Sequence, residues 1–379
     1  MSEEKLVPKL RFSGFTDEWN EVTLNDVATF SKGKGISKND ISNYGIECVR
    51  YGELYTKYNE MIYNIESKTD LNKNELKLSE KNDILMPCSG ETAIDLATAS
   101  CIQKDQVAIG GDITVIKTNQ YAPFITYYLN QKKTEIAKYA QGVSIVHLYP
   151  KDFKVMNIRI PSINEQKMII GLLEEITKKE QLLESKYQQY QEYKKYLMQQ
   201  IFTQKLRFDF DEIRLKSISK INKGKQLNKE HMLEIGKFYV LNGGQEPSGY
   251  TDSWNTSENT VTISEGGNSC GFVNFNTEKF WSGGHCYYLN KLSENIDVYY
   301  LYSYLKFIEP QIMRLRVGSG LPNIQKGDIE NIKIKILPKK EQIKISNLLL
   351  STDNKISSIE SQKDSFEIFK KGLLQQMFV

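Results

Sequence analysis

The chain has 379 residues, enough for two domains with separate hydrophobic cores, and its formal net charge of +3 is only a weak indication of a nucleic-acid partner. The five cysteines are odd in number and show no paired metal-ligand spacing, so we expect core residues in a reducing cytosol rather than disulfides or a zinc site. The start of the chain is charged and no stretch has the apolar length of a membrane span, so we expect a cytoplasmic protein.

The first 160 residues combine helix and strand patterns. A short helix rich in aromatic side chains is predicted at about 122–140. Strict alternation from Val155 to Ile160 predicts a half-buried strand that closes the domain, and Pro161 breaks the chain before the next element. Between helix and strand lies a polar loop that is anchored by Gly142 and leads into His147 and Leu148.

Residues 165–202 predict one long helix. They contain no proline, and their apolar side chains recur at alternating spacings of three and four residues. At 1.5 Å per residue, such a helix would be a rod of roughly 57 Å. The apolar seam is interrupted by Glu180 and Lys194 and consists of Ile169, Leu173, Ile176, Leu183, Tyr187, Tyr190, Leu197 and Ile201. A helix buried within a domain core is the alternative interpretation.

This segment is present twice. Residues 341–378 match 165–202 without a gap, from Glu165-Gln166 against Glu341-Gln342 to Phe202 against Phe378. The second seam is interrupted by Thr352, Lys363 and Lys370 and consists of Ile345, Leu349, Ile356, Ile359, Phe366, Leu373 and Met377. Two such helices with charged flanks favour packing against each other.

The duplication extends to the domains. Lys9-Leu10-Arg11-Phe12 recurs as Lys205-Leu206-Arg207-Phe208, and Lys32-Gly33-Lys34 recurs as Lys223-Gly224-Lys225. A second helix at about 297–315, a second glycine-anchored loop with Asn323 in place of His147, and an alternating strand at 332–336 follow in the same order. We therefore predict a domain at 1–160, a helix at 161–204, a second domain at 205–337 and a second helix at 338–379, with similar ends and diverged middle regions.

These residues resemble the specificity subunit of Type I restriction-modification enzymes. The resemblance covers the whole chain and rests on three features: the opening Pro8-Lys9-Leu10-Arg11-Phe12 with Gly14-Phe15 and Trp19, the Gly/Ser loops leading into His147-Leu148 and Asn323-Ile324, and the Pro-Ser-Ile-Asn-Glu-Gln entry at 161–166. It implies an α+β fold in which two similar target-recognition domains are separated by two long helices that form an antiparallel coiled coil, with a pseudo-twofold internal repeat.

The resemblance further implies a subunit that reads DNA and has no catalytic activity of its own. Each domain would read one half of a split, asymmetric target in double-stranded DNA, while the helices act as a spacer and, through the seam residues named above, bind two modification subunits. Restriction subunits would complete the complex. S-adenosylmethionine, ATP and Mg are then expected on the partner subunits and none of them on this chain. Two readers on a rigid spacer reach one face of DNA only if their half-sites lie about one helical turn, roughly 34 Å, apart.

Candidate DNA contacts follow from residue type and paired position. The lysines that flank Gly33 and Gly224 could bind phosphates, with solvated surface lysines as the alternative. Polar residues of the two glycine-anchored loops could contact phosphate or base edges, with loop stabilisation as the alternative. The complete set is Lys32, Lys34, Ser144, His147, Tyr149, Lys151, Lys223, Lys225, Ser319, Asn323, Gln325 and Lys326. Base readers are expected in the diverged middles, unranked among Arg50, Tyr51, Ser89, Glu91, Thr92, Asn242, Gln245, Glu265 and Asn268.

Motifs for catalysis are missing from the sequence. Gly33-Lys34 is followed by Gly35 rather than the hydroxyl residue of a Walker loop, and no Pro-Pro or Pro-Asp pair is present for a methyltransferase or nuclease loop. We interpret the diglycines Gly110-Gly111 and Gly283-Gly284 as tight turns. Two other functions remain open: a self-contained DNA methyltransferase or nuclease, and a coiled-coil scaffold without a role on DNA.

Overall fold

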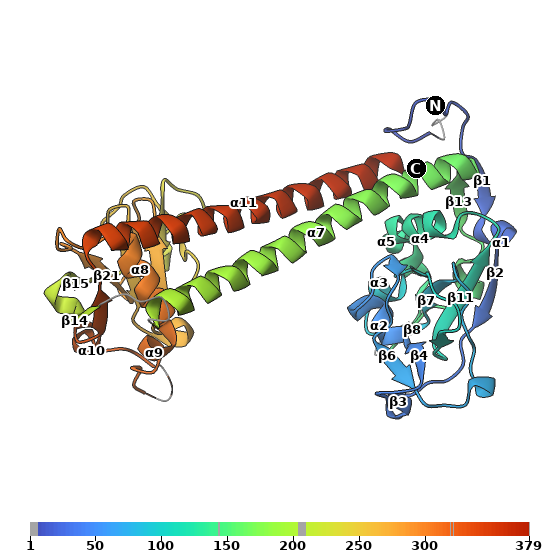
Figure 1. Ribbon diagram of the computed structural model, residues 1–379. Coiled ribbons are helices and arrows are strands. Elements are labelled where there is room, and N and C mark those ends of the chain that lie inside the picture. Colours follow the sequence, from blue (N-terminus) through green and yellow to red (C-terminus); the bar gives the residue numbers. More distant parts are fainter. Residues whose placement is uncertain (1–6, 143–144, 204–209, 319, 321, 379) are drawn as a thin grey trace. The chain divides into compact units, whose positions relative to one another are not determined.

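The computed structural model describes residues 7–142, 145–203, 210–318, 320 and 322–378. The chain divides into two compact units, which are unit 1 (Met1–Leu182 with Lys363–Val379) and unit 2 (Leu183–Gln362) (Figure 1). Each unit combines a globular α+β domain with one part of each long helix.

Unit 1 contains two main sheets. The larger has the strand order β2 (Ala28–Lys32), β11 (Ile113–Thr118), β7 (Ile84–Pro87), β9 (Ser100–Ile102) and β5 (Met61–Ile62). The smaller has the order β10 (Ala108–Ile109), β4 (Ile46–Val49), β6 (Ser67–Thr69) and β3 (Ile41–Ser42). Two short pairs join β1 (Asn20–Thr23) to β13 (Asn157–Ile160) and β8 (Ser89–Gly90) to β12 (Val146–His147). The helices are α1 (Leu24–Val27), α2 (Tyr51–Thr56), α3 (Ala93–Leu96), α4 (Ala122–Gln131), α5 (Lys133–Ile136) and α6 (Pro150–Phe153), and the long helix α7 (Ile163–Phe202) begins in this unit.

Unit 2 has the same plan with fewer strands. Its larger sheet has the order β15 (Lys220–Lys223), β21 (Cys286–Asn290), β18 (Thr260–Ser264) and β19 (Val273–Asn276). Its smaller sheet has the order β17 (Gly249–Thr251), β16 (Phe238–Leu241) and β20 (Trp281–Ser282), and β14 (Asp211–Arg214) pairs with β22 (Lys333–Ile336). The helices are α8 (Val298–Phe307), α9 (Glu309–Met313) and α10 (Lys326–Glu330), and the long helix α11 (Lys339–Met377) begins in this unit.

The strand pairing confirms the internal repeat. The order β2-β11-β7-β9 in unit 1 corresponds to β15-β21-β18-β19 in unit 2, and a parallel pair, β4 with β10 or β16 with β20, recurs in each smaller sheet. The antiparallel closing pairs also match, because Asn20 faces Ile160 in one unit and Asp211 faces Ile336 in the other. Each closing strand leads directly into a long helix.

Several predicted boundaries shift in the structure. The first closing strand begins at Asn157, not Val155, because a turn from Phe153 to Met156 precedes it and leaves Val155 61% exposed. The helix expected at about 122–140 is divided into α4, α5 and a three-ten turn, and the helix expected at about 297–315 is divided into α8 and α9. Pro310 explains the second division, because proline is accommodated in the first turn of a new helix but not in a helix interior.

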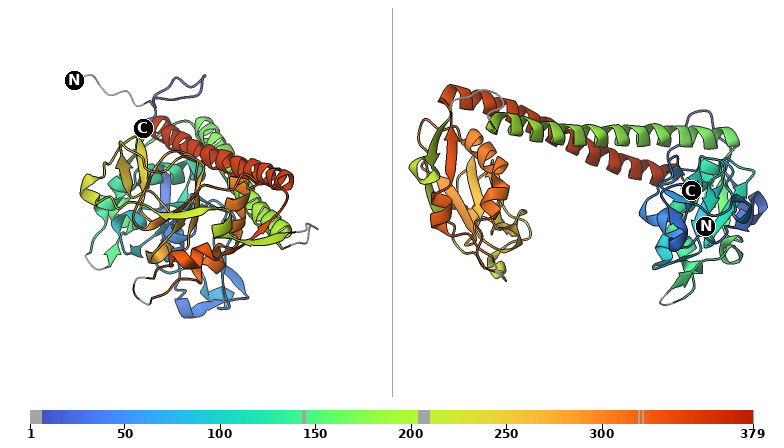
Figure 2. Two further views of the ribbon diagram at one scale, coloured as in Figure 1. Left: turned by 90° about the vertical axis from the view of Figure 1, so that its left-hand side faces the viewer. Right: turned by 60° about the horizontal axis from the view of Figure 1, so that its bottom comes forward.

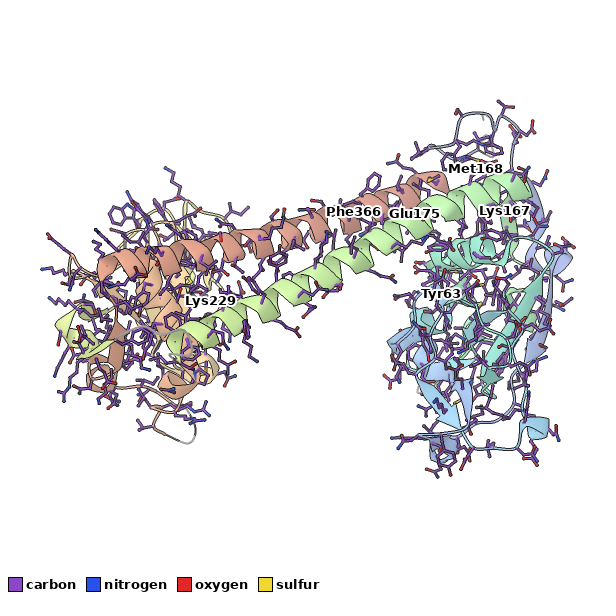
Figure 3. The ribbon with its side chains drawn as sticks, viewed as in Figure 1. Tyr63, Lys167, Met168, Glu175, Lys229 and Phe366 are labelled. Carbon is purple, nitrogen blue, oxygen red and sulfur yellow. The ribbon has the colours of Figure 1, made fainter. Side chains whose placement is uncertain are left out.

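Both long helices are present over nearly the predicted ranges. Within unit 1, the end of α11 lies against the first part of α7. Within unit 2, the first part of α11 lies with the last part of α7. The two helices therefore run antiparallel (Figures 1 and 2). The predicted seam residues are all buried or half-buried. Phe366, which Figure 3 shows on α11, packs against the core of unit 1.

The alternative of a core helix is correct for part of each seam. Ile169, Leu173 and Ile176 belong to the core cluster of unit 1, together with Leu373 and Met377 from α11. In unit 2 the core cluster includes Ile345 and Leu349 from α11, and Met198, Ile201 and Phe202 from α7. Each domain is therefore completed by the end of the helix that follows the other domain in the sequence.

The repeated Glu-Gln pair has a structural role. Gln166 and Gln342 are both fully buried, and each accepts a hydrogen bond from the backbone N–H before α4 or α8, at 3.0 Å from Tyr121 and 2.9 Å from Asp297. Glu165 accepts two hydrogen bonds from the Arg11 guanidinium, at 2.7 and 2.8 Å, and so holds the N-terminal segment on α7. The equivalent arginine, Arg207, lies outside the described residues.

Candidate nucleic-acid interface

A cleft opens in unit 1 where the two sheets meet. Its walls come from the end of β2, the residues after β4, helix α2 and the turn between β10 and β11. We call it cleft 1, and it is lined by Lys32, Gly35, Ile36, Ser37, Lys38, Asp40, Arg50, Tyr51, Gly52, Glu53, Tyr55, Thr56, Lys57, Gly110, Gly111 and Asp112. Cations and tyrosines predominate over acids among its polar side chains, so it can accept anionic and hydrogen-bonding groups.

A buried carboxylate organises the cations of cleft 1. Glu53 is only 3% exposed, and it accepts hydrogen bonds from the Ser67 hydroxyl and from the backbone N–H of Arg50. Its Oε1 also lies 3.3 Å from Lys57 Nζ and 3.7 Å from Arg50 Nη2. A buried charge requires such compensation. Glu53 therefore holds two cationic side chains at the cleft wall.

Unit 2 has a cleft in the equivalent place. It is formed by the end of β15, the residues after β16, the turn between β20 and β21, and the segment after β18. This cleft 2 is lined by Lys223, Asn242, Gly243, Gly244, Glu265, Gly266, Gly267, Asn268, Ser269, His285, Pro322 and Asn323. Its walls are richer in glycine and amide groups than those of cleft 1.

Glu265 is the central polar group of cleft 2. Its carboxylate accepts hydrogen bonds from Lys223 Nζ at 2.6 Å and from the Tyr287 hydroxyl at 3.0 Å, and it lies 3.3 Å from His285 Nδ1. Burial alone would raise the pKa of Glu265, but these hydrogen bonds outweigh it and hold the pKa below its ordinary value. Burial and the same carboxylate raise the pKa of the Tyr287 hydroxyl.

In unit 1, Cys88 occupies the position of Glu265. The backbone N–H of Cys88 donates to the Asp112 carbonyl at 2.8 Å, and that of Glu265 donates to the His285 carbonyl at 2.9 Å. Burial raises the pKa of the Cys88 thiol, so this position is uncharged in unit 1 and charged in unit 2. The two clefts therefore share a backbone frame and differ in chemistry.

The Lys-Gly-Lys segments and the diglycines, which were predicted separately, lie against each other. A Cβ atom on Gly33 would come 1.9 Å from the Gly110 carbonyl oxygen, and one on Gly224 would come 2.2 Å from the Gly283 carbonyl oxygen. Only glycine permits so close an approach of two backbones. The diglycines thus join β10 to β11 and β20 to β21 while supporting one wall of each cleft.

The predicted lysines divide into two groups. Lys32 and Lys223 line the clefts, where Lys32 Nζ lies 3.6 Å from Asp112 and Lys223 Nζ is bound to Glu265. Lys34 and Lys225 are exposed and line neither cleft.

Residues of the first glycine-anchored loop form a connected group outside cleft 1. His147 Nδ1 lies 3.1 Å from the Ser89 hydroxyl, and the His147 ring stacks on Tyr149 with 5.8 Å between ring centroids. Lys151 Nζ lies 5.9 Å from the Tyr149 ring centroid. Ser144 lies outside the described residues. The stacked rings leave Tyr149 39% exposed at the surface.

The second loop carries a matching arrangement. The backbone of Asn323 forms an antiparallel β-bridge with Val317, and the backbone of His147 forms the same bridge with Gln141. This confirms that Asn323 is the counterpart of His147. Gln325 donates to Asn323 Oδ1 at 3.1 Å, and Lys326 lies 3.5 Å from Glu330. Asn323 lines cleft 2, whereas Gln325 and Lys326 do not, and Ser319 lies outside the described residues.

Some of the predicted base-reading residues line a cleft and others do not. Arg50 and Tyr51 line cleft 1, and Asn242, Glu265 and Asn268 line cleft 2. The others line neither cleft 1 nor cleft 2. Ser89 binds His147, the Thr92 hydroxyl caps α3 by accepting from the Asp95 N–H at 3.1 Å, and Glu91 and Gln245 lie elsewhere on the loops. Sequence reasoning missed Glu53, Lys57 and Asp112, because nothing local distinguishes them from other charged residues.

Other features of the described chain bear on function. All five cysteines are buried, as predicted for core residues. Within the described ranges, no cluster of three or more His, Cys, Asp or Glu side chains is arranged to hold a metal ion. The same part of the chain includes no helix with the length and apolar character needed to cross a membrane.

Comparisons with known proteins agree on one family. The model of the Type I restriction modification DNA specificity domain matches residues 16–191 and again 208–367. A putative type I specificity subunit of Mycoplasma genitalium is 33% identical over 147 residues, and one of Mycoplasma pneumoniae is 34% identical over 124 residues. These alignments cover 38% and 32% of this chain, and they span only 38% and 33% of the two relatives.

A longer match and a solved structure extend the comparison. A putative specificity subunit of the MjaX type I restriction enzyme of Methanocaldococcus jannaschii is 24% identical over 293 residues, which cover 68% of this chain and 67% of the relative. The crystal structure of a type I restriction-modification S subunit from M. genitalium has the same fold, with a TM-score of 0.74 and 21% identity over 98% of this chain and 99% of that one. With two matched domains spanning most of its length, the chain belongs to the type I restriction-modification DNA specificity family.

Proposed function

We propose that this chain is the DNA-recognition subunit of a type I restriction-modification enzyme and has no catalytic activity of its own. Each unit reads one half of a split, asymmetric target in double-stranded DNA. The observation that carries the proposal is the pair of clefts, which occupy the same place in two units of one topology yet present different side chains. Similar frames with different polar walls are suited to reading two different short sequences.

The chemistry of the clefts supports contact with duplex DNA. Lys32 and Lys223 stand at the same position of each frame and can approach phosphates, which supplies affinity but no sequence information. The other polar residues of the two clefts include arginine, asparagine and carboxylate side chains, which are the groups that read base edges in the major groove.

The long helices are the proposed docking site for two modification subunits, with restriction subunits completing the complex. Because the seam residues are buried or half-buried within the chain, we assign the docking of modification subunits to apolar residues that the helices leave exposed. On α7 these include Leu182, Tyr193 and Tyr196, and on α11 they include Leu348, Ile368 and Phe369. S-adenosylmethionine, ATP and Mg belong to the partner subunits in this proposal.

Co-expression with the modification subunit of the same system tests the proposal. We expect the proteins to co-purify and the host DNA to carry methylated adenines in a split, asymmetric motif, detected by single-molecule sequencing. A complex that binds duplex DNA without sequence preference would refute the reading function. Failure to bind both DNA and a modification subunit would favour a scaffold, and methylation or cleavage by the isolated chain would favour a self-contained enzyme.

A further inference from the structure

We infer that the residue following the first strand of the parallel pair is a base-reading residue in each unit: Arg50 recognises a guanine in one half-site, and Asn242 recognises an adenine in the other. This inference rests on the proposed function and goes beyond it by naming the reading side chains and the base that each selects.

Strand register makes the two positions equivalent. Val49 ends β4 and pairs in parallel with Ile109, and Leu241 ends β16 and pairs in parallel with Ser282. The next residue along the chain is Arg50 in unit 1 and Asn242 in unit 2, and each lines the cleft of its unit. The same backbone position therefore carries an arginine in unit 1 and an asparagine in unit 2, and these two side chains differ in their hydrogen-bonding pattern.

The position of Arg50 is set by its own backbone and by Glu53. The Arg50 N–H donates to Glu53 Oε2 at 2.9 Å as the chain enters α2, and Nη2 lies 3.7 Å from Glu53 Oε1. The side chain is 28% exposed, and its Nε is buried with no hydrogen-bond partner in the described part of the chain. The guanidinium is therefore oriented but retains unused donors.

Asn242 also has unused hydrogen-bonding capacity. Its Oδ1 is buried and has no partner among the described residues. A Cβ on Gly283 would lie 2.3 Å from this oxygen, so the diglycine turn leaves just enough room for the amide. The terminal torsion of asparagine is broad and roughly twofold, so rotation about Cβ–Cγ can direct both amide atoms into cleft 2.

The two side chains match different bases. A guanidinium donates two hydrogen bonds to O6 and N7 of guanine, whereas a carboxamide accepts from N6 and donates to N7 of adenine. The surroundings fit this assignment, because Lys32, whose contact with Asp112 is long and exposed, supplies phosphate-binding charge in cleft 1 and leaves the planar fork of Arg50 for geometric selection. This pairing would give the two half-sites different sequences.

Selection of bound duplexes from a randomised pool, using the chain in complex with its modification subunits, tests the inference. The wild-type motif should contain a guanine in one half and an adenine in the other. Arg50→Lys keeps the charge but loses the bidentate fork, so the guanine preference should fall roughly tenfold while the salt dependence of affinity stays unchanged. Asn242→Asp is isosteric and should abolish the adenine preference in the other half only. Lys81→Ala, on an exposed lysine outside cleft 1, is the control and should leave the motif intact.

The unaffected half-site reports that each variant is folded and assembled. The inference is overturned if either variant retains the wild-type motif, if both variants alter the same half, or if the affected position is not guanine for Arg50 and adenine for Asn242. A wild-type complex that selects no motif would refute the proposed function itself, so the two failures are distinguishable.

Discussion

Lys370 Nζ lies 3.0 Å from Glu180 Oε2, so a polar interruption of the α11 seam pairs with a polar interruption of the α7 seam. The repeat places Lys194 at the position of Lys370, and Lys194 Nζ lies 2.5 Å from Asp353. Both pairs are largely shielded from solvent, with side chains 18–26% exposed. Polar groups within an apolar seam fix the register and direction of helix pairing, and these two pairs do so once in each unit.

Breaking the Lys370–Glu180 pair is expected to destabilise unit 1. Glu180→Leu leaves a half-buried ammonium without its carboxylate and should cost about 1–3 kcal/mol, roughly 2–12 °C in Tm for a unit of this size. The double variant Glu180→Leu/Lys370→Leu should recover most of the loss, because apolar seam residues replace a shielded pair at little cost. Thermal unfolding followed by circular dichroism measures this, and equal losses in the single and double variants would contradict it.

Gly33 and Gly224 should tolerate no side chain. Alanine at either position places Cβ within 2.2 Å of a backbone carbonyl oxygen, so the wall of that cleft must move. We expect each substitution to cost about 1–3 kcal/mol, read as a lower unfolding midpoint in urea. Gly35→Ala is the matched control, because its Cβ meets no atom within 4 Å. A midpoint for Gly33→Ala equal to that of the control would refute the argument.

Arg11 is expected to matter far more than Arg159, although each pairs with a glutamate. The partner of Arg11, Glu165, is 1% exposed, whereas Arg159 and its partner Glu21 are 30% and 41% exposed. Arg11→Ala leaves a buried carboxylate unpaired and should cost about 3–5 kcal/mol, against at most about 1 kcal/mol for Arg159→Ala. Differential scanning calorimetry of the two variants compares them directly, and similar shifts in Tm would show that the N-terminal segment is not held by this contact.

Glu265 should make stability depend on acid pH. Its pKa in the folded chain lies below the ordinary value of 4.5, so its contribution is complete above the unfolded pKa and is lost as pH falls through the folded pKa. Glu265→Gln should therefore lower Tm by a few degrees at pH 7, and the difference from wild type should shrink below about pH 4. Glu258→Gln, at an exposed position, should show no such trend. A constant difference from pH 7 to pH 3 would contradict the assignment.

The two cleft lysines should differ in their contribution to DNA binding. Lys32 and Asp112 are 57% and 48% exposed and 3.6 Å apart, so Lys32 is free to move to a phosphate. Lys223 is bound at 2.6 Å to Glu265, which is 12% exposed, so its charge is largely neutralised. Lys32→Ala should reduce the slope of log affinity against log salt by about 1, and Lys223→Ala should reduce it by less. Fluorescence anisotropy with the assembled complex over a salt series measures both slopes.

The sequence predicted the parts of this fold that depend on local pattern. The spacing of apolar residues and the absence of proline identified both long helices almost to the residue. The repeat then identified Asn323 as the counterpart of His147, and the strand register confirms this. Boundaries were missed where local chemistry was ambiguous, as at Val155, which continues the strand alternation but lies in a turn.

Only the tertiary structure decided the composition of the clefts and the partners of the polar residues. Lys32, Arg50 and Asp112 are separated in the sequence and meet only because β2 and β4 end where β11 begins. Arg50 and Lys57 lie three and four residues from Glu53 along the chain, but only folding removes the water around this carboxylate and brings the Ser67 hydroxyl of β6 against it. Periodicity and duplication are properties of the chain itself, whereas a cleft and a buried charge arise from contacts between distant segments, and no spacing rule along the chain encodes those contacts.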